Sequence, residues 1–157
     1  TYFSKWPEVW NHGDWATVDE EGFWFLRGRA DDTIKVAGRR TGPAEIEAAL
    51  IDHPAVVEAA AIGVPHEIKG NEVVCFVVLA EKIEKSPELV EELKQQVVKA
   101  MGKALTPREI HCVSALPKTR SAKIVRGVIQ KKFLGQDLGD TASVENLAAI
   151  EAIPSIS

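Results

Sequence analysis

Apolar residues recur at two different spacings along the chain, and each spacing predicts a different element. In one segment they return every four positions: Leu89, Leu93, Val97 and Met101. This period predicts an amphipathic helix with one buried stripe. Ser86 suits the N-cap of that helix and Pro87 its first turn. Residues 73–79 are apolar without alternation, which predicts a central strand covered on both faces.

The remaining pattern completes a small α+β domain. A helix is expected to begin at Pro43, and another to cover residues 121–133. Further strands are expected over residues 33–36, 56–62 and 110–113, with a turn at 37–40. Helices and few strands alternate, so we expect a mainly antiparallel three-stranded sheet flanked by helices. The last twenty or so residues show little pattern and are expected to wrap the surface.

The first thirty residues differ from the rest because they hold all four tryptophans, the last of them Trp24. Residues 15–18 and 23–26 flank the polar segment 19–22, which predicts a β-hairpin. Such aromatic density needs a partner surface to bury it. The hairpin is therefore assigned to the edge of a larger domain. The chain opens on Thr1 without an initiator Met, which indicates a fragment of a longer protein.

Composition argues against nucleic-acid-binding, membrane-spanning and disulfide-rich classes of protein. The net charge of −4 gives no global field that would attract nucleic acid. The longest apolar runs are too short to span a bilayer, and no signal peptide precedes them. Cys75 and Cys112 form no CxxC pair, which argues against a disulfide framework or a zinc site and favours a reducing, cytoplasmic setting.

Two groups of charged residues could carry chemistry. Six cations lie between positions 118 and 132: Lys118, Arg120, Lys123, Arg126, Lys131 and Lys132. They could meet an anion at a helix N-terminus or form an ordinary solvated face. The second group places Asp14 near Arg29 and Arg40, where a carboxylate could accept bonds from sugar hydroxyls and arginines could hold a phosphate. A turn carboxylate among exposed arginines is the alternative.

Three motifs occur in order along the chain. Residues 28–40, followed by 45–47, resemble the signature that opens the C-terminal domain of acyl- and aryl-CoA ligases, peptide-synthetase adenylation domains and luciferases. Residues 117–123, Pro-Lys-Thr-Arg-Ser-Ala-Lys, resemble the final catalytic-lysine motif of that superfamily. Segments 9–15, 65–70 and 138–141 are similar to acetyl-CoA synthetases and their short-chain relatives.

The resemblance implies domain boundaries and residue roles. Residues 1–30 would end a large N-terminal adenylate-forming domain, 31–32 would form the hinge, and 33–157 the C-terminal lid. The implied site residues are the catalytic Lys123, the nucleotide-binding Asp14, Arg29 and Arg40, the CoA-binding Ala37 and Gly38, and the hinge residue Asp31. No metal ligand is implied in this chain, because Mg²⁺ would be held with ATP by the N-terminal domain.

The implied activity is that of an acid–thiol ligase. It would activate a short, acetate-like acid with ATP to an acyl-adenylate and pass the acyl group to CoA. The chain alone should be inactive, because the phosphate loop and the acyl pocket belong to the other domain. A ligase for a medium-chain or aryl acid is one alternative, and a regulatory module that kept the lid fold is another. A basic helix that binds nucleic acid is a weaker option.

One residue departs from the superfamily pattern. Ala122 stands before the lysine where the family usually has Gly. Alanine does not adopt a positive φ cheaply, so this loop either avoids that geometry or is altered. In relatives the lysine is also acetylated by protein acetyltransferases that recognise the loop. Ala122 leaves open whether such a partner acts on Lys123.

Overall fold

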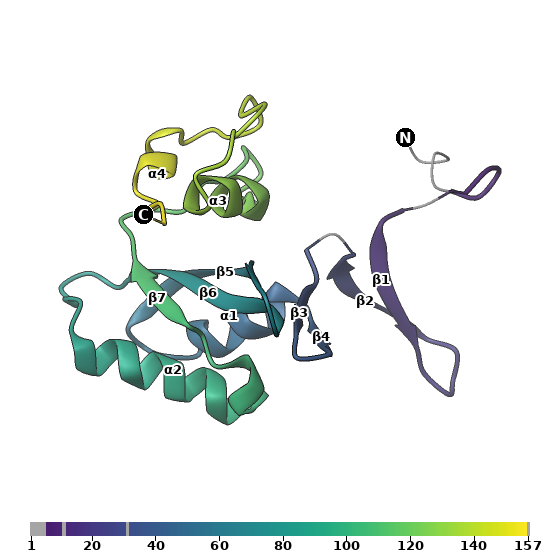
Figure 1. The fold of residues 1–157 in the computed structure, drawn as a ribbon, viewed down its shortest axis with the longest axis horizontal. Coiled ribbons are helices and arrows are strands. Elements are labelled where there is room, and N and C mark those ends of the chain that lie inside the picture. The colour runs from purple at the N-terminus through teal and green to yellow at the C-terminus, as the bar shows by residue number, and fades with distance from the viewer. Residues whose placement is uncertain (1–5, 11, 31, 157) are drawn as a thin grey trace.

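The computed structural model describes residues 6–10, 12–30 and 32–156, and it divides them into a hairpin and an α/β body (Figure 1). In the hairpin, β1 (Asp14–Val18) pairs antiparallel with β2 (Trp24–Arg29). The expected hairpin is thus confirmed. Strand β2 extends past the expected end at residue 26 to residue 29, because the backbone there pairs with β1 as far as Asp14.

The hairpin keeps its large side chains exposed. Trp24 and Leu26 are each 74% exposed, and Trp10 and Phe23 are exposed by more than half. In Figure 1 the hairpin stands beside the body and joins it only at one end. An exposed apolar surface of this size is typical of a segment that packs against another surface.

The body is built on one mixed sheet, which confirms the expected α+β class. Its strands are β3 (Ile34–Val36), β4 (Arg39–Thr41), β5 (Val56–His66), β6 (Gly70–Leu79) and β7 (Glu109–Cys112). The order is β4-β3-β6-β5, and β7 lies parallel to β6. The sheet has five strands instead of three. Strand β3 matches the strand expected over residues 33–36. Strand β4 was not expected, because residues 39–40 of the predicted turn pair with β3 instead.

Strand β6 is covered on both faces, as its continuous apolar sequence predicts. Val73, Cys75 and Val77 face one cluster, while Val74 and Phe76 face another. Helices α1 (Pro43–Ile51) and α2 (Pro87–Met101) cover the first face, and α3 (Arg126–Phe133) and α4 (Ala148–Glu151) lie over the second (Figure 1). A 3₁₀ turn, Lys103–Leu105, follows α2. The result is three layers with the sheet in the middle.

The predicted starts of α1 and α2 are confirmed. Pro43 opens α1, and the Ser86 hydroxyl accepts a hydrogen bond of 3.1 Å from the backbone N–H of Leu89. The predicted stripe of α2 points inward, with Leu93 and Val97 fully buried. Both signals are local, which is why the sequence reveals them.

The predicted start of the third helix is wrong. Helix α3 begins at Arg126, five residues after Ser121. Residues 118–124 instead form a turn closed by a bridge between Lys118 and Ile124. The Thr119 hydroxyl accepts the backbone N–H of Lys123 at 3.2 Å, so this side chain competes with helical bonding. Lys123 therefore lies in a loop before the helix and not at its N-terminus.

The final segment contributes to the core as well as covering the surface. Val144, Ile150 and Ile153 are buried in it. Ile153 belongs to the cluster that contains Phe133 and Leu116, so the tail packs on α3 and on the residue before the Lys123 loop. Among the described residues, every helix falls short of the length and apolar character that crossing a bilayer requires.

The turn between β5 and β6 carries a small charge cluster around Glu72. Lys69 Nζ lies 2.8 Å from its carboxylate, and His66 Nε2 and Arg108 approach to 3.5 and 3.6 Å. The hydrogen bond from Lys69 lowers the pKa of Glu72, and the charges of Lys69, His66 and Arg108 act in the same direction. The ionised carboxylate is therefore favoured by the folded state.

Replacing Glu72 should change the acid limb of the stability curve. Because the folded-state pKa is depressed, the stabilisation by Glu72 is complete above the ordinary glutamate pKa of about 4.3 and is lost as pH falls through the lower folded value. In urea titrations, the difference in unfolding free energy between wild type and Glu72→Gln should shrink as pH falls below about 4. Glu67→Gln, exposed on the same turn, is the control. A difference that grows on acidification would contradict the assignment.

Candidate functional site

A cleft of about 660 Å³ lies between the hairpin and the body. Asp14 and Arg29 line it from the hairpin strands, Arg40 from β4, and Lys123 from the loop before α3. These residues come from both sides of position 31. The structure thus brings together all four residues expected to bind the nucleotide or to act on it. Asp31 itself lies outside the described residues.

Two neighbours orient the Asp14 carboxylate. Arg29 is its partner in the strand register, with NH1 at 3.9 Å from Oδ1. His12 Nδ1 lies 2.5 Å from Oδ2. Gly13 has a φ of +82°, and a Cβ at this position would meet the Arg29 guanidinium at 3.4 Å. Glycine therefore leaves room for Arg29 beside Asp14. The carboxylate is only 19% exposed, so its position is well defined. The role of His12 was missed, since a scattered histidine gives no signal in sequence.

Arg40 is held over an aromatic ring from the opposite side of the cleft. Its guanidinium carbon lies 5.5 Å from the centroid of the Trp15 ring, a cation–π contact. Strands β4 and β1, which carry these residues, share no backbone pairing. A second contact spans position 31, where the Thr33 hydroxyl reaches the carbonyl of Arg29 at 3.4 Å. Both contacts depend on the present orientation of the hairpin and the body.

Lys123 projects from a tight turn with a strained backbone. The N–H of Thr119 donates to the carbonyl of Lys123 at 2.9 Å, and that of Ala122 donates to Thr119 at 2.9 Å. Ala122 has a φ of +62°. The loop therefore keeps the left-handed geometry that glycine would adopt freely, and the alanine carries the strain.

Ala122→Gly should relieve this strain. A left-handed alanine costs roughly 1–2 kcal/mol, and glycine gives back about 0.4–1 kcal/mol through the unfolded state, so a net gain of up to about 1 kcal/mol is expected. Urea unfolding measures it. Gly127→Ala is the matched control for the opposite change. Gly127 lies in α3 with open space at its Cβ, so alanine should stabilise by about 0.5–1 kcal/mol. A loss of stability in Ala122→Gly would contradict the strain.

The structure places Ala37 and Gly38 apart from the cleft. They form the turn between β3 and β4, with φ of +48° and +82°. The N–H of Ala37 donates to the carbonyl of Lys69 at 2.9 Å, which joins this turn to the β5–β6 turn. Arg39 fixes the same turn to the end of α2, with NH1 2.8 Å from the carbonyl of Met101. A Cβ on Gly38 would meet nothing within 4 Å.

An ion pair between Arg126, which lines the cleft, and the buried Glu47 supports one wall of the cleft. Arg126 donates from Nε and NH2 to the two carboxylate oxygens of Glu47, at 2.7 and 2.6 Å. The N–H of Ala61 also donates to Glu47 at 3.0 Å, and Asp32 lies 3.5 Å from Arg126. Hydrogen bonding to Glu47 raises the pKa of Arg126. The sequence motif contains Glu47, but its pairing with a residue 79 positions away could not be predicted.

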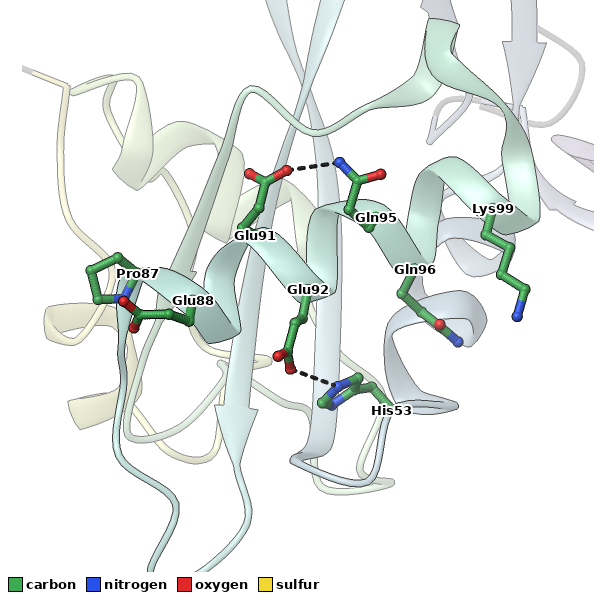
Figure 2. A pocket seen from close by; sticks show the side chains of 8 residues that line it. All are labelled: His53, Pro87, Glu88, Glu91, Glu92, Gln95, Gln96 and Lys99. Atoms are coloured by element: carbon green, nitrogen blue, oxygen red, sulfur yellow. Dashed lines mark hydrogen bonds and ion pairs between the residues drawn. The ribbon is translucent and has the colours of Figure 1, made fainter.

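Another hollow, more open than the cleft, runs along α2 and contains none of the expected site residues. Figure 2 shows its carboxylates with neighbours of their own: Gln95 donates to Glu91 at 2.7 Å, and His53 lies 3.7 Å from Glu92. Within the described residues, no three His, Cys, Asp or Glu side chains converge to hold a metal ion. The cleft is therefore the candidate site.

Comparisons with known proteins identify the family of the chain. The sequence profile described as the AMP-binding enzyme C-terminal domain matches residues 45–123, about half of the chain. The chain belongs to this family. The matched segment begins in α1 and ends at Lys123, so this AMP-binding C-terminal domain has its family motif inside the body and at the edge of the cleft.

Individual relatives carry the names of coenzyme A synthetases. The chain is 48% identical over 153 residues to a 3-hydroxypropionyl-coenzyme A synthetase from Sulfurisphaera tokodaii and 42% identical over 155 residues to an acetyl-coenzyme A synthetase from Escherichia coli. Each alignment covers 98% of the chain. Among solved structures, an acetoacetyl-CoA synthetase from Streptomyces lividans covers 96% of the chain with a TM-score of 0.82 and 27% identity, and 23% of that structure is covered.

The chain spans about a quarter of these relatives. It covers 23% of the Sulfurisphaera protein and 24% of the Escherichia protein. The similarity thus establishes the family and the fold of this part.

Proposed function

We propose that this chain is the lid of an AMP-forming acyl-CoA ligase that activates a short carboxylic acid. Residues 1–30 end the large N-terminal domain, Asp31 and Asp32 form the hinge, and the body is the lid. The observation that carries the proposal is the cleft, where Asp14, Arg29, Arg40 and Lys123 meet. A carboxylate beside three cations suits a nucleotide, which offers ribose hydroxyls and a polyphosphate.

In the first half-reaction, the carboxylate of the acid attacks the α-phosphate of ATP, the bond to the β-phosphate breaks, and pyrophosphate leaves. Two negative groups must approach each other, so a cation near their oxygens lowers the barrier. The Lys123 ammonium supplies that charge from a flexible side chain on a defined loop. Asp14 accepts hydrogen bonds from the ribose hydroxyls, and Arg29 and Arg40 lie toward the phosphates. Mg²⁺ would be held with ATP by the N-terminal domain and would offset further phosphate charge.

In the second half-reaction, the CoA thiol attacks the acyl-adenylate and releases AMP. We propose that the lid turns about Asp31 for this step and presents the Ala37–Gly38 turn to the pantetheine. The positive φ of both residues and the open space at Gly38 suit a thin ligand that runs along the backbone. This turn lies outside the present cleft, in keeping with a lid that uses two faces in succession.

The acid is proposed to be short. Relatives that act on acetate and 3-hydroxypropionate, by their names, align over nearly the whole chain. The test is an assay of AMP and pyrophosphate release by the complete enzyme with ATP, Mg²⁺, CoA and acids from acetate and 3-hydroxypropionate to benzoate. Release with one or two short acids is expected. Activity only with medium-chain or aryl acids would replace the substrate class, and ATP binding without turnover would favour a regulatory module.

Two further expectations belong to the same proposal. The ligase is expected to work in the cytoplasm, where ATP and CoA are available and its free thiols remain reduced. Acetylation of Lys123 by a protein acetyltransferase would remove the charge that adenylation needs. Mass spectrometry of the enzyme after incubation with such a transferase and acetyl-CoA tests this partner. No modification at Lys123, with modification restored in Ala122→Gly, would show that Ala122 prevents recognition.

A further inference from the structure

The base of the Lys123 loop is held by a side chain from the C-terminal tail. The amide oxygen of Asn146 accepts the backbone N–H of Lys118 at 2.8 Å, and its amide nitrogen donates to the carbonyl of Leu116 at 2.8 Å. The N–H of the neighbouring Glu145 donates to the carbonyl of Lys118 at 2.9 Å. Asn146 thus bonds the chain on both sides of Pro117, in the way that a paired strand would.

We infer that Asn146 is a positioning residue for Lys123: it fixes the base of the loop and so aims the lysine into the cleft. The inference rests on the proposed role of Lys123. The loop leaves the body at Lys118 and returns at Ile124, and these two residues form a backbone bridge between its two arms. The tip, with Arg120, Ser121 and Ala122, is exposed. Its direction is therefore set by how the base is held.

The other side-chain contacts near the loop do not hold the backbone that precedes it. Lys118 Nζ forms an ion pair with Glu58 of β5, but that contact fixes a side chain and not the backbone. Arg126 anchors the start of α3 after the loop. On the side before the loop, the backbone N–H of Lys118 and the carbonyls of Leu116 and Lys118 are all bonded by residues 145–146. Removing the Asn146 side chain takes away both bonds that it makes to this arm, at Leu116 and Lys118. The backbone bonds from Glu145 to Lys118 and between the two arms remain, so the base of the loop is loosened and not released.

The amide chemistry offers a sharp test. Asn146→Asp keeps the size and can still accept from Lys118, but a carboxylate cannot donate to the carbonyl of Leu116. Asn146→Ala removes both bonds. The matched control is Glu151→Gln in the same tail. It removes an ion pair of 3.0 Å with Lys132, near the end of α3 that is opposite to the loop.

Both half-reactions are measured in the complete enzyme. Acetate- or 3-hydroxypropionate-dependent exchange of pyrophosphate into ATP reports adenylation, and conversion of synthetic acetyl-adenylate with CoA reports thioester formation. Asn146→Asp and Asn146→Ala should slow adenylation by about 10- to 100-fold, the cost of misplacing a reacting group by about 1 Å. Thioester formation, which does not use Lys123, should be unchanged, as should both reactions in Glu151→Gln.

Equal loss of both half-reactions in the Asn146 variants would overturn the inference, because it would indicate general damage to the lid. Unchanged adenylation, in an enzyme that Lys123→Ala inactivates, would also overturn it while leaving the proposed function intact. Adenylation that survives Lys123→Ala would overturn the proposed function and this inference together. Hydrogen exchange gives a readout without activity: the amides of Thr119 and Lys123 should exchange faster in Asn146→Ala, and unchanged exchange contradicts the role.

Discussion

Lys123→Ala in the complete enzyme should nearly abolish adenylation while thioester formation from supplied acyl-adenylate continues. Removing one group that stabilises transition-state charge costs about 3–4 kcal/mol, or roughly 10²- to 10³-fold in rate. The loss should be confined to the first half-reaction because Lys123 lines the present cleft, whereas the Ala37–Gly38 turn lies outside it. Pyrophosphate exchange and acyl-adenylate conversion measure the two halves separately.

Arg120→Ala is the matched control for this prediction. Arg120 is an exposed cation of the same loop, but it does not line the cleft. Its removal should leave both half-reactions near wild type. A similar loss in both lysine and arginine variants would mean that the net charge of the loop matters and not the position of Lys123. Equal loss of both half-reactions in Lys123→Ala would refute a lid with two separate faces.

Arg126→Ala should destabilise the body more than any other single substitution described here. It leaves the Glu47 carboxylate, only 8% exposed, with one backbone donor from Ala61. Breaking a buried pair by removing one partner typically costs about 3–5 kcal/mol. The free energy of unfolding in urea, measured on the 157-residue chain near pH 7, gives the value.

Two variants distinguish the loss of the Glu47–Arg126 pair from the loss of an ordinary surface charge. Lys132→Ala removes an ion pair whose partner Glu151 is 78% exposed, and it should cost less than about 1 kcal/mol. Combining Glu47→Gln with Arg126→Met removes both charges at once, and the new amide oxygen can still accept the N–H of Ala61, so the pair should recover part of the loss. If Arg126→Ala costs no more than Lys132→Ala, Glu47 is solvated and the pair is not a structural support.

Local signals explain most of what the sequence reveals about the fold. Ser86 and Pro87 mark the start of α2 because a cap depends only on neighbouring residues. The continuous apolar run of β6 predicts coverage on both faces, and helices lie on both. The pairing of β7 beside β6 could not be predicted in the same way. A parallel neighbour is chosen by tertiary packing across the α2 crossover, and four residues carry little register information.

The residues of the site also fall into those that the sequence predicts and those that it does not. Motif residues Asp14, Arg29, Arg40 and Lys123 were predicted from resemblance, and the structure lines one cleft with them. The supporting contacts could not be predicted. Arg126 and Asn146 bond to segments far away in the sequence, and the contact of His12 with Asp14 depends on the local turn. The start of α3 was misjudged for a related reason. Thr119 and the left-handed Ala122 close a turn where periodicity alone continues the helix.

The buried thiol of β6 makes unfolding of the body observable by alkylation. Cys75 is fully buried in the central strand, and burial raises the pKa of its thiol, while Cys112 at the sheet edge is partly exposed. Only a thiolate reacts with alkylating reagents, so Cys75 becomes labelled when the sheet itself separates. The rate of the slow alkylation phase therefore reports how often the body unfolds globally, and no introduced probe is needed.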